Sequence, residues 1–158
     1  MSKAEAGYEL LKAAIGQTEG TSEWLEITQE RINEFADVTE DHQFIHVDPE
    51  KAAALSPWGV PIAHGFLTLS LLVKLSSTIK QPMEPFDGMV MGVNYGFEKI
   101  RFIQAVKVNS RIRCTSVLSG VELKDENTLH TIRTMTVEIE GESKPALVAE
   151  WITRIVYG

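Results

Sequence analysis

The chain has 158 residues, a net charge of −7 and a hydrophobic fraction of 44%. This length suits one domain with a sizeable core, and we expect residues 1–158 to form a single domain. General nucleic-acid binding needs a basic surface, so the acidic balance argues against a nucleic-acid partner.

Cysteine usage and the N-terminal residues indicate the compartment. Cys114 is the one cysteine of the chain, which excludes an intrachain disulfide. The first residues lack the apolar centre of a signal peptide, and the longest apolar segment is too short to span a bilayer. We therefore expect a cytoplasmic protein without a membrane partner.

The first half of the chain carries helical patterns. Apolar residues recur at helical spacing over residues 3–15. Thr28 is a good N-cap for a second, amphipathic helix. Asp48 followed by Pro49 predicts the start of a short helix over residues 50–55.

The most apolar segment, residues 65–78, predicts a buried helix. Its apolar side chains would point in nearly every direction around a helix, as in helices that are surrounded by protein. They belong to Phe66, Leu67, Leu69, Leu71, Leu72, Val73 and Leu75.

The second half of the chain changes character. Its long segments are rich in Val, Ile, Thr and aromatic residues, which is typical of strands, and turn residues between them favour antiparallel hairpins. Helices first and strands later predict an α+β fold, in which one buried helix packs against a long curved antiparallel sheet. The four segments are residues 89–102, 111–118, 128–140 and 146–157.

Positive charge gathers in residues 99–113, which contain no acidic side chain. A small anionic ligand could use such a local patch, although a solvated strand face explains it at least as well. The five basic residues are Lys99, Arg101, Lys107, Arg111 and Arg113.

Asp41 and His46 lie in a polar stretch and suit general acid–base chemistry. A carboxylate and an imidazole can hold one water molecule between them and move protons to and from it. Taken alone the pair is weak evidence, because an Asp that caps a loop and a His that satisfies backbone groups are common. Two functions therefore stay open for these side chains, catalysis and local structure.

His64 and Gly65 stand where the apolar helix would begin. A glycine there lets a ligand approach the backbone closely, and free N–H groups at a helix start favour negative charge. This predicts an oxyanion hole at Gly65 for a thioester carbonyl that becomes an enolate. Alternatively, the glycine only permits tight packing, and Ser70 only bonds back to its own helix.

A metal site is an alternative to these proton-transfer roles. His42 and His46 are four residues apart, which on a helix would place both on one face. Residues 41–48 do not show a helical pattern, however, and the sequence has no HExxH arrangement. We therefore expect no metal.

Several motifs together resemble a known family. Asp41-x-x-x-x-His46, followed by Ala63-His64-Gly65-Phe66-Leu67 and Ser70, is similar to the MaoC-like (R)-specific enoyl-CoA hydratases. Residues 35–39, 45–49 and 94–96 fit the NodN-like subgroup of that family. The resemblance covers about residue 20 to the end of the chain.

The resemblance implies a hot-dog fold, with the sheet wrapped around a central helix over residues 65–78, and a homodimer. It also implies hydration of trans-2-enoyl-CoA to (R)-3-hydroxyacyl-CoA without a cofactor, because the substrate itself carries coenzyme A. Asp41 would activate water with His46 as its acid–base partner, the Gly65 N–H would bind the thioester oxygen, and Ser70 would support the pair. We expect further substrate contacts at Ala63, His64, Phe66, Asn94, Tyr95, Gly96 and Arg101.

The chain departs from the broader family at two places in the motif. The broader family has Gly where Glu40 stands and Asn-Pro where Gln43-Phe44 stands. Two rivals to the hydratase therefore remain: an acyl-CoA thioesterase on the same fold, and a non-catalytic acyl-CoA binding protein.

Overall fold

The computed structural model describes residues 1–80 and 87–158. These residues form a six-stranded antiparallel sheet with the order β1-β4-β5-β6-β3, in which β2 also pairs with β4. The strands are β1 (Thr18–Thr21), β2 (Leu25–Glu26), β3 (Met89–Phe102), β4 (Arg111–Asp125), β5 (Thr128–Ile139) and β6 (Leu147–Tyr157). The helices of this part of the chain are α1 (Lys3–Ala13), α2 (Gln29–Thr39), α3 (Phe44–Val47), α4 (Pro49–Leu55), α5 (Gly65–Ser70) and α6 (Leu72–Ser76).

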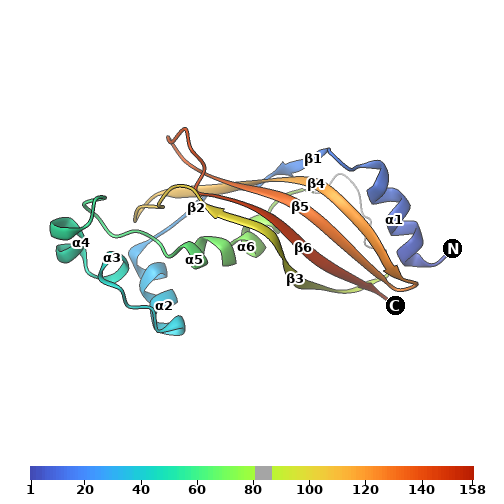
Figure 1. The fold of residues 1–158 in the computed structure, drawn as a ribbon, viewed down its shortest axis with the longest axis horizontal. Coiled ribbons are helices and arrows are strands. Elements are labelled where there is room, and N and C mark those ends of the chain that lie inside the picture. The colour runs from blue at the N-terminus through green and yellow to red at the C-terminus, as the bar shows by residue number, and fades with distance from the viewer. Residues whose placement is uncertain (81–86) are drawn as a thin grey trace.

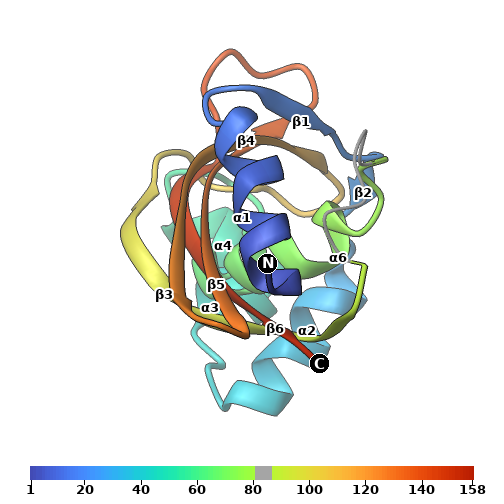
Figure 2. The ribbon, with the colours of Figure 1, turned by 90° about the vertical axis from the view of Figure 1, so that its right-hand side faces the viewer.

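The long strands curve around α5 and α6, as the end-on view shows best (Figure 2). Helix α1 lies at one end of the sheet, and α2, α3 and α4 lie at the other end, where α5 begins (Figure 1). The predicted α+β fold, with a long curved antiparallel sheet around a central helical segment, is confirmed.

The central helix differs from the prediction in two ways. Leu71 has a ψ of −9° and separates α5 from α6, so the segment is not one continuous helix. The segment is also not buried on all sides, because the side chains of Phe66 and Val73 are 67% and 52% exposed. Only the face that meets the sheet is covered in the single chain.

Two apolar clusters fill the concave side of the sheet. The larger one joins α2, α5 and α6 to the strands and includes Ile32, Leu72, Met135 and Leu147, all nearly or fully buried. The smaller one lies under α1. Along β6, Leu147, Ala149, Trp151, Ile155 and Tyr157 are buried, whereas Glu150 and Arg154 on the other face are partly exposed.

Local capping fixes the helices that lead to the candidate site. Thr28 accepts a hydrogen bond from the Arg31 N–H (3.2 Å), and Asp48 accepts one from the Lys51 N–H (3.0 Å) with Pro49 at the first helical position. The expectation that residues 41–48 contain no helix is wrong, because α3 forms a short turn of helix within them.

Two strands can be compared with their predicted bounds. The predicted strand 89–102 agrees with β3, whereas β4 continues past residue 118 to Asp125. An irregularity between Leu118 and Gly120 lets pairing with β5 resume beyond the glycine.

No helix within residues 1–80 and 87–158 is long and apolar enough to cross a membrane.

Candidate active site

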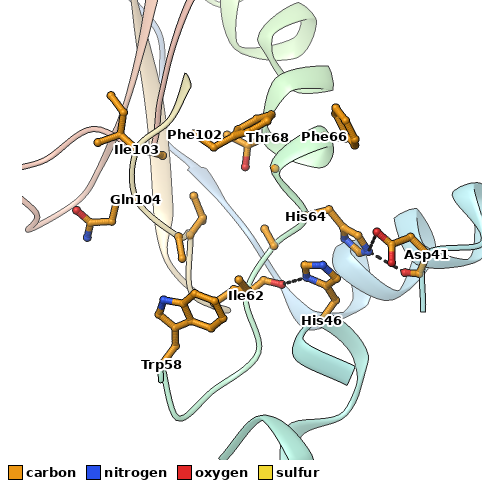
Figure 3. A pocket seen from close by; sticks show the side chains of 15 residues that line it. Asp41, His46, Trp58, Ile62, His64, Phe66, Thr68, Phe102, Ile103 and Gln104 are labelled. Atoms are coloured by element: carbon orange, nitrogen blue, oxygen red, sulfur yellow. Dashed lines mark hydrogen bonds and ion pairs between the residues drawn. The ribbon is translucent and has the colours of Figure 1, made fainter. Parts of the chain in front are cut away.

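A cavity of about 630 Å³ opens where α5 begins, between the short helices and the end of the sheet. Asp41, His46 and His64 meet at one side of it, and Trp58 and Phe102 form other parts of its wall (Figure 3). Residues that are far apart in the sequence therefore converge as the motifs predicted.

His46 is buried and held at its main chain and at its ring. Its Nδ1–H donates to the Ile62 carbonyl (2.7 Å), and the Gln29 side chain donates to the His46 carbonyl (2.8 Å). With the proton on Nδ1, the neutral ring keeps a lone pair on Nε2. Burial lowers the pKa of His46, which favours this neutral form.

Asp41 follows the end of α2 directly. Glu40 ends that helix in the left-handed conformation with a φ of 60°, and the turn delivers Asp41 to the cavity with its side chain about half exposed (52%). A left-handed residue is the position where glycine is free of strain. This geometry explains why a glycine stands here in the broader family.

The start of α3 explains the second departure from the family motif. Gln43 is the N-cap residue of α3 and makes no hydrogen bond from its side chain to the helix. Asn is a preferred N-cap residue and Pro suits the first helical position, so Asn-Pro fits this turn better than Gln43-Phe44. The loop nevertheless presents both Asp41 and His46 to the cavity.

His64 takes a position that the sequence did not predict. It is only 2% exposed, and its Nε2–H donates to the Asp41 carbonyl (2.9 Å) and lies 4.0 Å from an Asp41 carboxylate oxygen. Its ring stacks on that of His46, with centroids 3.8 Å apart and an interplanar angle of 23°. His64 therefore contacts both Asp41 and His46 and also lines the cavity.

Gly65 opens α5 at the wall of the cavity. A Cβ atom at this position would come within 3.0 Å of the Phe102 ring. Any larger residue here would therefore need the Phe102 ring to shift by a few tenths of an ångström, so the glycine lets this ring approach the start of α5 closely.

The other predicted site residues do not all join the pair. Ala63 and Phe66 line the same cavity, whereas Ser70 donates its hydroxyl to the Leu67 carbonyl (2.8 Å) within its own helix. Ser70 and Asn94 line another, smaller cavity of about 240 Å³, which Phe66 also lines. The structure does not bring Ser70 to the pair.

Tyr95, Gly96 and Arg101 lie on β3 and do not line the first cavity. The Tyr95 ring packs on His130 and on the Arg154 guanidinium. Arg101 is exposed and donates to the Ile100 carbonyl.

The predicted basic patch is largely neutralised by neighbouring strands. Lys99, Arg111 and Arg113 form ion pairs with Glu150, Glu140 and Glu138, respectively. Glu150 is in β6, Glu138 is in β5 and Glu140 directly follows β5, so these partners could not be predicted from residues 99–113 alone.

The site also forms the one candidate metal cluster in residues 1–80 and 87–158. One ligand atom each from Asp41, His46 and His64 lie within 4.8 Å of one another. Because the two imidazole rings are stacked nearly parallel, their in-plane lone pairs do not converge on one point. This geometry suits a shared water molecule better than a chelated ion.

The long antiparallel sheet curved around α5 and α6 is the hot-dog fold. The (R)-hydratase from A. caviae involved in PHA biosynthesis has the same fold, with a TM-score of 0.68 and 21% identity over 88% of this chain and 94% of that chain. The family model for the MaoC like domain matches residues 11–140. The chain belongs to the MaoC-like domain family.

Two curated relatives are much closer in sequence. Nodulation protein N from Rhizobium meliloti (strain 1021) is 51% identical over 90% of this chain and 86% of its own length. The 3-hydroxyacyl-thioester dehydratase Z from Mycobacterium tuberculosis is 51% identical over 92% of this chain and 93% of its own length. The resemblance to the NodN-like subgroup is thereby confirmed.

Proposed function

We propose that this chain is a hydro-lyase that adds water to trans-2-enoyl-CoA to give (R)-3-hydroxyacyl-CoA, and catalyses the reverse dehydration. One observation carries the proposal: a carboxylate and a neutral imidazole lie close enough to share one water molecule, beside the backbone of Gly65. Two groups that each hydrogen-bond the same water are separated by at most about 5–6 Å. A carboxylate oxygen of Asp41 and a ring nitrogen of His46 lie within 4.8 Å of each other, which satisfies that limit.

The proton transfers balance within this pair. His46 Nε2 takes a proton from the water as its oxygen bonds to C3, and the C2=C3 electrons move to the thioester carbonyl to form an enolate. The protonated His46 then returns the proton to C2, so the pair ends as it began. The resemblance implied that Asp41 activates the water, but here His46 Nε2 is the base, and Asp41 orients the water and stabilises the imidazolium between the two steps.

Gly65 supplies the oxyanion contact in this scheme. Its backbone N–H donates to the thioester oxygen as negative charge develops there, which lowers the barrier to enolate formation. Ala63 and Phe66 contact the substrate on either side of this point. The scheme needs no metal and no redox cofactor, because the thioester itself acidifies C2.

The relatives support the reaction class. A protein named 3-hydroxyacyl-thioester dehydratase shares half of its residues with this chain over nearly the full length of both. The (R) configuration of the product is proposed from the fold shared with the (R)-hydratase. Coenzyme A is proposed as the carrier, and the assay below distinguishes it from an acyl carrier protein.

We also propose that two copies form a homodimer through β3. This strand is at the edge of the sheet, with no partner strand beyond it among the described residues. An uncovered edge of this length invites pairing with another chain. Apolar side chains gather on it and are 41–63% exposed: Met89, Val90, Met91, Val93 and Tyr95.

The test of the proposed reaction is turnover of crotonyl-CoA and of a longer trans-2-enoyl-CoA, followed through loss of the conjugated thioester absorbance. The same acyl groups on pantetheine and on acyl carrier protein identify the carrier, and stereospecific dehydrogenases read the product configuration. Hydration to the (R) product is the expected result. Release of free thiol without hydration would instead identify a thioesterase, and binding without turnover would identify an acyl-CoA binding protein.

Light scattering tests the dimer. A mass near twice 17.6 kDa is expected. A monomer at micromolar concentration would contradict the pairing through β3.

A further inference from the structure

We propose that His64 is a positioning residue. Its side chain anchors Asp41 by a hydrogen bond to the Asp41 main-chain carbonyl, and its ring stacks on the ring of His46 and supports it. This inference rests on the proposed hydration chemistry for its kinetic consequences. It assigns His64 a role other than the substrate contact that the sequence motif suggests.

Two contacts of His64 reach the proposed catalytic pair. Its Nε2–H donates to the carbonyl of Asp41 at 2.9 Å, across 23 positions of the sequence. One face of its ring stacks on His46, and Phe35 packs tilted against it with ring centroids 4.9 Å apart. A side chain with only 2% exposure and these neighbours has little surface left for a substrate.

The hydrogen bonds also distinguish the two stacked rings. His46 donates from Nδ1, which leaves Nε2 as an acceptor for water. His64 donates from Nε2, and its Nδ1 is buried without a hydrogen-bond partner in the described part of the chain. A proton on that Nδ1 would be a buried N–H without an acceptor, which is unfavourable, so the contacts favour Nε2 as the donor nitrogen of His64.

Anchoring matters because Asp41 has little other support. Helix α2 ends at Thr39 with Glu40 as its C-cap, and within residues 1–80 and 87–158 the one hydrogen bond to the Asp41 carboxylate is a long one from the Gln43 N–H (3.4 Å). Without His64, the Asp41 carbonyl loses a partner and the loop gains freedom. A displacement of about 1 Å of a catalytic group can reduce the rate on the order of 10²-fold.

Three substitutions separate anchoring from packing. In His64→Gln the amide nitrogen stands as many bonds from Cβ as Nε2 does, so it still reaches the Asp41 carbonyl. His64→Asn keeps an amide but is too short, and His64→Leu keeps bulk without a donor. Phe35→Leu is the matched control, because it removes packing against His64 and leaves the hydrogen bond.

The expected kinetic result is a loss of kcat with little change of KM. His64→Leu and His64→Asn lower kcat by on the order of 10²-fold, whereas His64→Gln and Phe35→Leu stay within about tenfold of the native enzyme. Equal losses in His64→Gln, His64→Asn and His64→Leu would overturn the proposal. A loss in Phe35→Leu as large as that in His64→Leu would also overturn it, since packing alone would then explain the effect.

Nitrogen-15 NMR of the imidazole rings provides a readout that needs no turnover. The Nε2–H tautomer is expected for His64 and the Nδ1–H tautomer for His46 in the native protein above neutral pH. Hydrogen exchange around Asp41 should accelerate in His64→Leu and not in His64→Gln. The opposite tautomer at His64, or unchanged exchange in His64→Leu, would overturn the anchoring role even if the native protein hydrates no enoyl thioester.

Discussion

The sheet and the loop that carries Asp41 and His46 are built in opposite ways. In the sheet, strand-forming residues alternate between a buried and a solvated face, and the buried members are packed to near-zero exposure, as at Met135 and Leu147. In the loop, Glu40 adopts a left-handed conformation, and Gln43 starts α3 without a side-chain cap. The sheet therefore provides the stability, and the loop places reactive groups at a local cost.

The largest difference between the two regions should appear in activity. Asp41→Asn and His46→Gln are expected to lower kcat/KM by about 10²–10⁴-fold, because each removes one of the two groups that handle the water. Unfolding by urea, followed by circular dichroism, should show that both variants remain folded. Activity within tenfold of the native enzyme in either variant would contradict the assignment of the pair.

The sheet should show the reverse response. Leu147→Ala leaves a cavity in the larger apolar cluster and is expected to lower the free energy of unfolding by about 2–5 kcal/mol. Turnover per folded molecule, measured well below the melting temperature, should be unchanged. Val148→Ala on the other face of the same strand is the control and should cost much less; equal costs would mean that the two faces of β6 do not differ.

The pH dependence sharpens the assignment of the imidazole. Burial, and to a lesser extent the neighbouring His64, lower the pKa of His46, whereas the Ile62 carbonyl and the nearby Asp41 raise it. Since the neutral ring is the active base, kcat/KM should stay constant as the pH falls to about 6.5, the ordinary histidine pKa, and decline only below it. A decline that begins above that pH would contradict a buried neutral His46.

The same shift predicts how stability responds to acid. Between the folded-state pKa of His46 and about 6.5, the unfolded chain binds more protons than the folded one. The stability that the folded state gains by keeping His46 neutral is therefore fully present above about pH 6.5 and is lost as the pH falls from there to the folded-state pKa. His46→Gln should reduce the acid dependence of the urea midpoint across this interval.

The smallest expected effect concerns the strained turn. Glu40→Gly should raise the free energy of unfolding by about 1 kcal/mol, because glycine adopts the left-handed conformation without the steric cost of a Cβ atom. Glu40→Ala is the control, since it removes the charge and keeps the Cβ. A gain in both variants would point to charge, and no gain in Glu40→Gly would show that the turn is unstrained.

Sequence patterns predicted the parts that depend on local periodicity. Strand β3, the caps at Thr28 and Asp48 and the meeting of Asp41, His46 and Gly65 were all foreseen. The break at Leu71 was not, because no Gly or Pro marks it in the sequence. The Asp41–His64 contact was equally invisible, since it depends on how two loops meet in three dimensions.

Two predictions about individual side chains were wrong because those side chains have other partners in the folded protein. Ser70 was expected beside the pair, yet its hydroxyl bonds within its own helix, as the structural alternative predicted. Residues 99–113 looked cationic because their acidic partners lie in other strands. In both cases the sequence identified the kind of side chain, but not the partner that this side chain has in the folded protein.

The stereochemistry of water addition in deuterium oxide tests the central claim most directly. In the proposed mechanism, Asp41 and His46 hold one water molecule on one side of the substrate. That water supplies both the hydroxyl group at C3 and the hydrogen at C2. A single deuterium at C2, on the same face as the new hydroxyl at C3, is the predicted result. Anti addition, or a mixture of both configurations at C2, would contradict a single water handled by one pair.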